Sequence, residues 1–157
     1  MRITALLLFC AASTSLANLG ETLKQTIGRY GPILKKEQVG QPPDLNPSDA
    51  TIQYGFEKNG FRITVSFVNG KCAWILYSKP DGPIYDIDLR TLLDNNAEGS
   101  QWNDGHDVTD SVYKKGIRYS RADGRANAEY VELGDDYHAL SIIAKAWRDA
   151  TSAASGL

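Results

Sequence analysis

The chain has 157 residues and a formal net charge of −2, with 17 lysine and arginine residues against 19 aspartate and glutamate residues. This weak acidic balance gives no electrostatic reason to expect nucleic acid or an anionic membrane surface as a partner. The length fits one compact domain, or two small units that share a core.

The first seventeen residues have the layout of a secretory signal peptide. Arg2 provides a positive start, an apolar run extends from Ile3 to Ala12, and Ser15-Leu16-Ala17 is a small-x-small cleavage site. The apolar run is too short to span a bilayer stably as a helix. We therefore predict that residues 1–17 are a signal peptide cleaved after Ala17, and that the mature protein is periplasmic or secreted.

The two cysteines indicate how the mature protein is stabilised. A lipid anchor on Cys10 needs a small residue directly before it, and Phe9 is bulky, so the pattern favours release without a membrane anchor. Only Cys72 remains after cleavage, which excludes an intramolecular disulfide and leaves stability to the apolar core. Cys72 lies in a strand-like run without a nearby activating histidine, which favours a buried structural thiol over a nucleophile.

A short helix is the first predicted element of the mature chain. It opens at Gly20-Glu21-Thr22 and ends at Gly31-Pro32. The residues that recur on its apolar face are Leu23, Ile27 and Tyr30. Residues 37–50 contain three prolines and are predicted to form a loop.

Two Asn-Gly pairs divide the next stretch into three strands. The strands are predicted over residues 51–56, 61–67 and 71–77, with turns at Asn59-Gly60 and Asn69-Gly70. Apolar and polar side chains alternate along 61–67, which is the period of a half-buried strand. Asn-Gly pairs tolerate the positive φ angles of tight hairpin turns. We predict a three-stranded antiparallel meander with one apolar face.

A second helix follows this meander. Asp86 or Asp88 is predicted to cap it, and Asn95-Asn96 with Gly99 to end it. Its buried stripe is expected to consist of Leu89, Leu92 and Leu93. Residues 97–116 are mostly polar and are predicted to form a connection in which Trp102 is the packing anchor.

The C-terminal third is predicted to contain a second meander. Strands over residues 117–121 and 126–131 flank Asp123-Gly124, with Ala126, Ala128 and Tyr130 on one face. The next stretch has two interpretations. Tyr137, Leu140, Ala144 and Trp147 recur as in a helix, whereas His138, Leu140 and Ile142 alternate as in a strand. We favour a strand over 137–143 and then a helix to about Thr151, because this completes the meander.

The predicted fold class is α+β, and the same order of elements occurs twice. A first helix-plus-antiparallel-meander unit is expected over residues 18–85 and a second over 86–157, packed as one compact domain with a C-terminal helix. Side-chain identity between the halves is slight, so the prediction of a tandem arrangement rests on topology.

Several phrases of the mature chain carry a resemblance. They are Leu19-Gly20-Glu21-Thr22, Arg29-Tyr30-Gly31-Pro32, Asn59 to Phe67 with Gly70-Lys71-Cys72, Leu92-Leu93 with Asn96, and Asp123-Gly124-Arg125-Ala126. Together they resemble a family of exported bacterial proteins to which no activity is assigned. More distantly, the fold expected here resembles the small lipoprotein of the outer-membrane β-barrel assembly machinery and, in its tandem form, the secreted β-lactamase inhibitor protein.

These distant resemblances imply a fold and no function. The assembly lipoprotein needs a lipidated N-terminal cysteine, which the Phe9-Cys10 pair does not provide. The inhibitor is stabilised by disulfides, which a single mature cysteine cannot form.

One polar loop is the best candidate for catalysis. Residues 103–107, together with Asp110, could build a metal or general acid–base site from Asp104, His106 and Asp107. Their spacing matches neither a closed zinc pattern nor a calcium loop, so a solvated loop is favoured and no cofactor or metal is expected. His138 is predicted to be a surface histidine at a strand end. A hydrolase or metal-dependent enzyme that uses the Asp104–Asp107 loop and His138 stays an alternative.

Tyrosine and tryptophan are the more informative side chains for function. Both are preferred anchors of protein interfaces, and an open antiparallel sheet can present them on its exposed face. The candidate binding residues are Trp74, Tyr77, Trp102 and Tyr119, although each could also serve the core. We expect a non-catalytic exported module that binds an envelope or extracellular protein through its sheet. A structural envelope protein is the further alternative.

Overall fold

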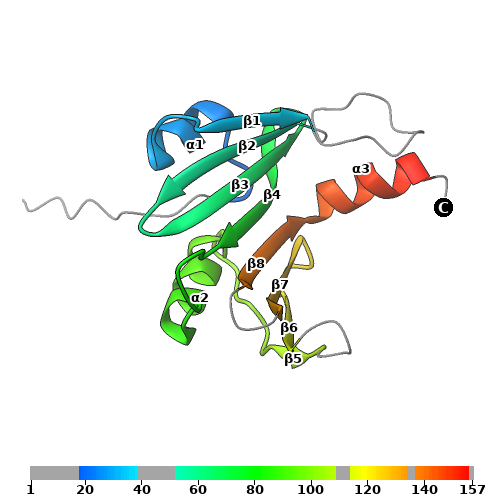
Figure 1. Ribbon diagram of the computed structural model, residues 1–157. Helices are drawn as coiled ribbons and strands as arrows, with labels where there is room; N and C mark the ends of the chain where they lie inside the picture. The colour runs from blue at the N-terminus through cyan, green and yellow to red at the C-terminus, as the bar shows by residue number, and fades with distance from the viewer. Residues whose placement is uncertain (1–17, 39–51, 109–113, 134–136, 156–157) are drawn as a thin grey trace, which may run out of the picture.

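The computed structural model describes residues 18–38, 52–108, 114–133 and 137–155. They form three helices and one eight-stranded antiparallel sheet, so the predicted α+β class is confirmed (Figure 1). The expected signal peptide, most of the predicted 37–50 loop, and Asp110 lie outside the described residues.

The sheet is assembled from two sets of four strands. Its order is β1-β2-β3-β4-β8-β7-β6-β5, and every neighbouring pair is antiparallel. The strands are β1 Lys35–Gln38, β2 Ile52–Lys58, β3 Phe61–Val68, β4 Lys71–Ser78, β5 His106–Asp107, β6 Lys115–Ser120, β7 Ala126–Leu133 and β8 Tyr137–Ala144. Pairing of β4 with β8 joins the two sets at the centre of the sheet.

The predicted hairpins form where the turn chemistry placed them. Asn59 and Gly60 have φ angles of 54° and 78°, and Asn69 and Gly70 have φ angles of 51° and 70°. These values suit the tight turns that connect β2 to β3 and β3 to β4, since both central residues of such turns need positive φ. Gly124, at the turn between β6 and β7, has a φ of 70°.

Helix α1 (Leu23–Tyr30) is capped at Thr22, and Gly31 follows its last turn. Of the predicted apolar face, Tyr30 is buried and Leu23 packs against the core, whereas Ile27 is exposed and Thr26 is buried instead. The helix is short, so a rotation by one residue changes which side chains reach the sheet.

Helix α2 (Asp86–Asn95) buries Leu89, Leu92 and Leu93, as predicted. Tyr85 is the N-cap residue, and of the two predicted aspartates Asp88 contributes to the cap from the third helical position. The Asp88 side chain lies three residues further on and accepts a hydrogen bond from the Tyr85 backbone N–H at 3.4 Å. Helix α3 (Lys145–Ser155) continues directly from β8.

Two strands extend the meanders beyond the three predicted for each. Strand β1 pairs with β2, so residues 37 and 38 are strand and the prediction of a loop there was wrong. Strand β5 pairs with β6 inside the segment predicted to be a polar connection. Over residues 137–143 the favoured strand is confirmed, since β8 pairs along its length with β7.

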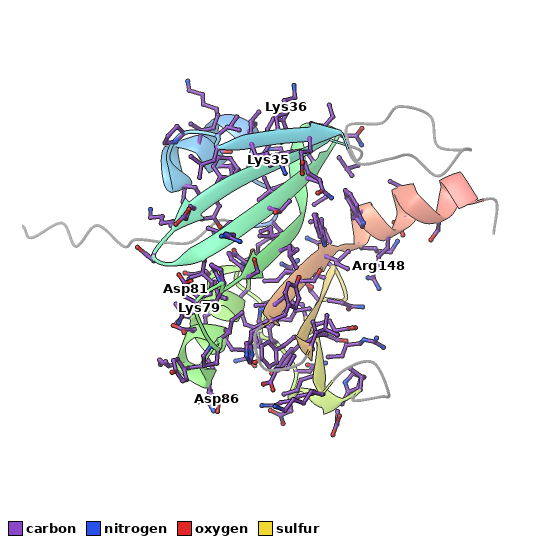
Figure 2. All side chains as sticks on the ribbon, in the orientation of Figure 1. Lys35, Lys36, Lys79, Asp81, Asp86 and Arg148 are labelled. Atoms are coloured by element: carbon purple, nitrogen blue, oxygen red, sulfur yellow. The ribbon has the colours of Figure 1, made fainter. Side chains whose placement is uncertain are left out.

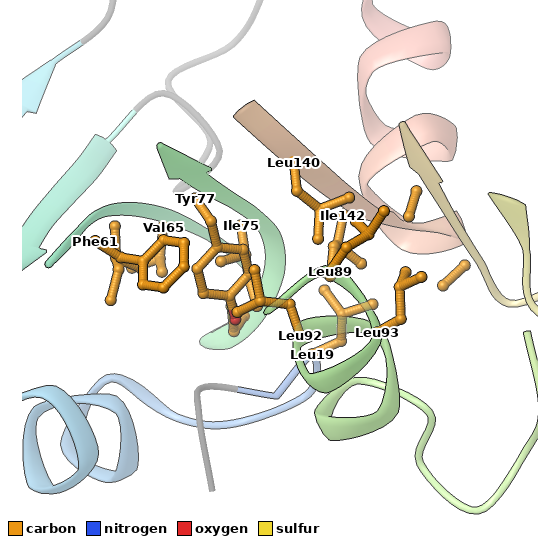
Figure 3. Close-up of a cluster of buried hydrophobic side chains, with 14 of the residues drawn as sticks. Leu19, Phe61, Val65, Ile75, Tyr77, Leu89, Leu92, Leu93, Leu140 and Ile142 are labelled. Carbon is orange, nitrogen blue, oxygen red and sulfur yellow. The ribbon is translucent and has the colours of Figure 1, made fainter. Parts of the chain in front are cut away.

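The hydrophobic core lies between one face of the sheet and helices α1 and α2. Charged side chains such as Lys35, Lys36 and Asp81 are exposed at the periphery (Figure 2). The centre of the core is formed by completely or almost completely buried side chains from the β3, β4 and β8 strands and from α2 (Figure 3). They include Ile63, Val65, Ile75, Tyr77, Leu92, Leu140 and Ile142. Both sets of strands therefore contribute to one core.

Candidate functional site

The two faces of the sheet are not covered alike. Alternate side chains along each strand point to opposite faces of the sheet. The side chains on one face pack against α1 and α2, and those on the other face do not. We call the second side the open face. Paired residues define it in three rows, each from β3 through β4, β8 and β7 to β6. The rows are Ser66-Trp74-Ile143-Asn127-Ser120, Thr64-Leu76-Ser141-Glu129-Arg118 and Arg62-Ser78-Ala139-Val131-Gly116.

A bulge sets which β4 side chains reach the open face. The register between β3 and β4 shifts between Ser66 and Phe67, so Ala73 is the extra residue between Cys72 and Trp74. Bulges insert one residue into a strand and change the face on which the following side chains lie. Cys72 therefore belongs to the core, while Trp74 and Leu76 lie on the open face.

At the centre of the open face, apolar side chains surround Ser141. Leu76, Val131 and Ile143 are half-buried there by their neighbours in the sheet. At one end, Leu133 and Tyr137 are directly paired across β7 and β8 and remain 38% and 41% exposed. Cross-strand apolar pairs of this kind present contiguous apolar surface rather than isolated exposed side chains.

Charged groups border this apolar centre. The Arg118 guanidinium donates to the Glu129 carboxylate through Nη2 at 2.7 Å and through Nε at 2.9 Å. The pair is partly exposed, so it fixes the positions of these two side chains more than it stabilises the fold. Arg62, at the β3 side, is also exposed.

Helix α3 covers one end of the open face. Trp147 stacks on Trp74 with ring centroids 5.9 Å apart and an interplanar angle of 23°. The Trp74 indole Nε1 donates to the Ser141 hydroxyl at 2.9 Å, which fixes the ring against the sheet. Trp74 is therefore half-buried at the border of the open face, and the α3 helix extends away from it (Figure 1).

Tyr77 does not belong to a binding surface. Its side chain is completely buried, and its hydroxyl lies 3.2 Å from the Tyr30 hydroxyl and 3.4 Å from Asn96 Nδ2. Burial raises the pKa of Tyr77 to about 12. The prediction of Tyr77 as a binding residue is thus corrected: its ring is part of the core, on the face opposite Trp74 and Leu76.

Trp102 and Tyr119 lie on the helix side of the sheet, beside a groove between α2 and residues 97–105. Both are half-buried. Trp102 is the packing anchor that the sequence predicted, since its Nε1 donates to the Leu93 carbonyl at 2.7 Å. The four predicted aromatic residues thus lie in three places: Trp74 at the border of the open face, Tyr77 in the core, and Trp102 and Tyr119 at the groove.

The residues of the enzyme alternative do not share one cleft. His106 and Asp107 form the exposed edge strand β5, and Asp104 lines the groove. His138 lies in β8, three strands away from β5, which at roughly 4.8 Å per strand places it about 14 Å away. Within the described residues, no group of three or more histidine, cysteine, aspartate or glutamate side chains is placed to hold a metal ion.

His138 is buried, which corrects the prediction of a surface histidine. Its Nδ1 lies 3.1 Å from the Tyr130 hydroxyl, which also donates to the Glu132 carboxylate at 2.8 Å. Burial, and then the Glu132 carboxylate, raise the pKa of the Tyr130 hydroxyl far above its usual value. This cluster therefore keeps Tyr130 protonated and serves packing.

Sequence reasoning missed Leu76, Val131 and Leu133. The signal for them was present, because β4 and β7 carry apolar side chains that point to both faces of the sheet rather than to one.

No protein-family model, curated protein or solved structure matches this chain. Among the described helices, none is long and apolar enough to cross a membrane.

Proposed function

We propose that this chain is an exported, non-catalytic module that binds another envelope or extracellular protein through the open face. The observation that carries the proposal is the apolar centre of that face, which α1 and α2 leave uncovered. Leu76 and Val131 lie within it, and the more exposed Leu133–Tyr137 pair continues it to the edge.

The chemistry of the open face fits a protein partner. Protein interfaces combine an apolar, aromatic-rich centre with a polar rim, and tyrosine is among their enriched residues. Tyr137 supplies such a side chain at the exposed end of the apolar surface, while Arg62 and the Arg118–Glu129 pair supply charged groups. An antiparallel sheet with one covered face ordinarily places polar residues on the other, so apolar residues there need a reason.

The order of the elements supports the finer part of the proposal, a tandem fold. Helix α1 is followed by strands β1–β4 and helix α2 by strands β5–β8, and the last strand of each set lies at the centre of the sheet. Two such units joined edge to edge provide one continuous binding surface wider than either would alone. This arrangement is similar to the one expected from the resemblance to the β-lactamase inhibitor protein.

Export is the second part of the proposal and rests on the signal-peptide pattern of residues 1–17. The fold is compatible with cleavage after Ala17. Leu19, the second residue after that site, is buried and donates its backbone N–H to Asn96 Oδ1 at 3.1 Å. The mature chain can thus be anchored in the core almost from its first residue.

Affinity capture tests the proposed interface. Tagged mature protein is incubated with envelope extract under mild cross-linking, and captured proteins are identified by mass spectrometry. Tyr137→Glu and Leu133→Glu place a charge at the exposed end of the apolar surface, and we expect each to reduce recovery of the partner at least about tenfold. The matched control is Ile87→Glu, which changes an even more exposed apolar residue (71%) on α2.

Two results would contradict the proposal. Recovery of no partner above background would remove the binding function itself. Equal loss of the partner with Ile87→Glu and Tyr137→Glu would place the interface elsewhere.

A further inference from the structure

A second candidate site lies on the side of the sheet opposite the open face. It is a groove of about 610 Å³ between α2 and the segment that follows it, with Tyr119 of β6 at its base. Small-molecule sites commonly have volumes of about 300–1,000 Å³. Its lining residues are Asp86, Leu89, Arg90, Leu93, Asp94, Ala97, Ser100, Gln101, Trp102, Asn103, Asp104, Gly105 and Tyr119.

One wall of the groove carries alternating charges. Asp86, Arg90 and Asp94 are spaced four residues apart, so they follow one side of α2. Asp86 lies in the first turn of the helix (Figure 2). All three are exposed, and within the described residues no ion pair joins Arg90 to either aspartate. The wall therefore offers a hydrogen-bond donor between two acceptors, all available to a ligand.

The opposite wall is held in place by backbone hydrogen bonds and supplies three neutral polar side chains and the Asp104 carboxylate. Asn103 N–H donates to the Ser120 carbonyl at 2.9 Å, and Ala122 N–H donates to the Gln101 carbonyl at 2.7 Å. The side chains of Ser100, Gln101, Asn103 and Asp104 border the groove on this side. Amides and hydroxyls both donate and accept hydrogen bonds.

The base of the groove is aromatic. The Trp102 ring is fixed by its hydrogen bond to the Leu93 carbonyl. Gly105 lies directly over Tyr119, because a Cβ at Gly105 would come within 2.6 Å of that ring. The Tyr119 hydroxyl makes no hydrogen bond within the described part of the chain. Two aromatic rings and a spare hydroxyl thus face the same space.

We propose that this groove binds a short neutral saccharide. Each sugar hydroxyl donates and accepts hydrogen bonds, which suits walls that mix carboxylates, amides and a guanidinium. The C–H groups of a sugar ring can lie against the electron-rich faces of Trp102 and Tyr119.

The charges of the groove disfavour other ligands. Three aspartates against one arginine oppose an anion such as a phosphate or an acidic peptide. A cationic peptide would meet Arg90 at the middle of the α2 wall. A purely apolar ligand would cover the polar side chains of the groove without forming hydrogen bonds to them.

Titration of the mature protein with three neutral tetrasaccharides tests the proposal. Cellotetraose, maltotetraose and tetra-N-acetylchitotetraose are added separately, and shifts of backbone amide and indole N–H signals are followed by two-dimensional NMR. We expect at least one to shift the signals of Trp102 and Gly105, with a Kd of roughly 1 mM or tighter. Binding of a neutral ligand should be unchanged in 0.5 M NaCl, which screens charge interactions.

A conservative pair of variants locates the site. Tyr119→Phe removes only the hydroxyl, and we expect it to weaken binding about three- to tenfold. Tyr85→Phe is the matched control, since Tyr85 is 61% exposed beside the same helix but does not line the groove. It should leave the Kd unchanged.

Three outcomes would overturn the saccharide site. They are the absence of any shift up to 20 mM of each tetrasaccharide, shifts confined to the open face, and equal Kd values for wild type and Tyr119→Phe. A trilysine peptide added as a further probe should not compete; preferential binding of that peptide in the groove would assign it to cations instead. None of these results bears on the protein partner proposed for the open face.

Discussion

Asn96 connects three parts of the core although its own side chain is completely buried. Its Oδ1 accepts from the Leu19 N–H, and its Nδ2 donates to the Leu92 carbonyl at 2.9 Å and approaches the Tyr77 hydroxyl. A buried amide with these partners is satisfied, whereas its loss leaves each partner without a substitute. The residue thus links the N-terminal segment, α2 and the sheet.

Asn96→Ala is therefore expected to lower the free energy of unfolding by about 3 kcal/mol, because it leaves buried backbone and hydroxyl groups unpaired. Urea titration followed by circular dichroism measures the change. Asn103→Ala, at an exposed position, should alter stability by less than about 0.5 kcal/mol. A loss of under 1 kcal/mol for Asn96→Ala would mean that the network does not contribute as described.

Cys72 is a free, buried thiol, as the sequence predicted. Burial, and then the nearby Glu21 carboxylate, raise the pKa of this thiol from 9.0 to about 12. The native state thus holds the proton of a group that the unfolded chain releases near pH 9. Stability from this group is fully present below pH 9 and is lost as the pH rises toward 12.

Comparison of wild type with Cys72→Ala isolates this effect. The stability difference, wild type minus variant, should decrease between pH 9 and 12, by at most about 1.4 kcal/mol per pH unit. Tyr77 is present in both proteins, so the effect of its own burial cancels and only its interaction with Cys72 stays in the difference. Denaturant titrations at successive pH values measure the difference. A difference that stays constant with pH would show that the thiol ionises as easily in the folded protein.

At the scale of elements, two glycines without positive φ have opposite surroundings. Gly28 lies inside α1, and a Cβ added there would meet nothing within 4 Å. A Cβ on Gly105 would lie 2.5 Å from Ile117 Cγ2 and 2.6 Å from the Tyr119 ring. Gly28 only weakens its helix, whereas Gly105 allows the wall of the groove to lie against β6.

Alanine at these two positions should therefore change stability in opposite directions. Gly28→Ala is expected to raise the free energy of unfolding by about 0.5–1 kcal/mol through helix propensity. Gly105→Ala is expected to lower it by about 1–3 kcal/mol, because Ile117 or Tyr119 must move. Thermal unfolding of both variants measures the changes. A neutral Gly105→Ala would show that the segment can move away from the sheet at no cost.

The elements that sequence reasoning predicted are those determined by local chemistry. The Asn59-Gly60 and Asn69-Gly70 turns carry their own φ preference, and the leucine stripe of α2 has its own period. Strand β1 has the sequence Lys-Lys-Glu-Gln and forms through backbone pairing with β2, so no side-chain pattern could predict it. The two-residue strand β5 depends in the same way on β6.

At the scale of the whole molecule, the pairing of β4 with β8 determines where the functional candidates lie. Their paired residues, from Trp74 with Ile143 to Ser78 with Ala139, are more than sixty positions apart in the sequence, and no local signal predicts that the strands are neighbours. Their register brings Leu76 beside Ser141 and positions Trp74 for the stack with Trp147. The sequence could suggest Trp74, Tyr77, Trp102 and Tyr119 as aromatic anchors. It could not show that they lie in different parts of the molecule, because this depends on the order of the strands and on the bulge at Ala73.

The shared core predicts how the molecule unfolds. Tyr77 and Ile75 of β4 pair with Leu140 and Ile142 of β8, and all four side chains are completely buried. Neither set of four strands can bury these residues without the other. We expect one cooperative transition, with coincident curves from far-ultraviolet circular dichroism and tryptophan fluorescence. Two separated transitions would show that the sets are independent units.

Site-specific photo-cross-linking in cells tests the central claim, that the open face binds another protein, most directly. A photoreactive phenylalanine analogue replaces Tyr137 on the open face or, as a control, Ile87 on α2, both of which are exposed. We predict that irradiation yields one discrete adduct with a second envelope or extracellular protein from position 137 and none from position 87. No adduct from position 137, or the same adduct from both positions, would contradict the claim.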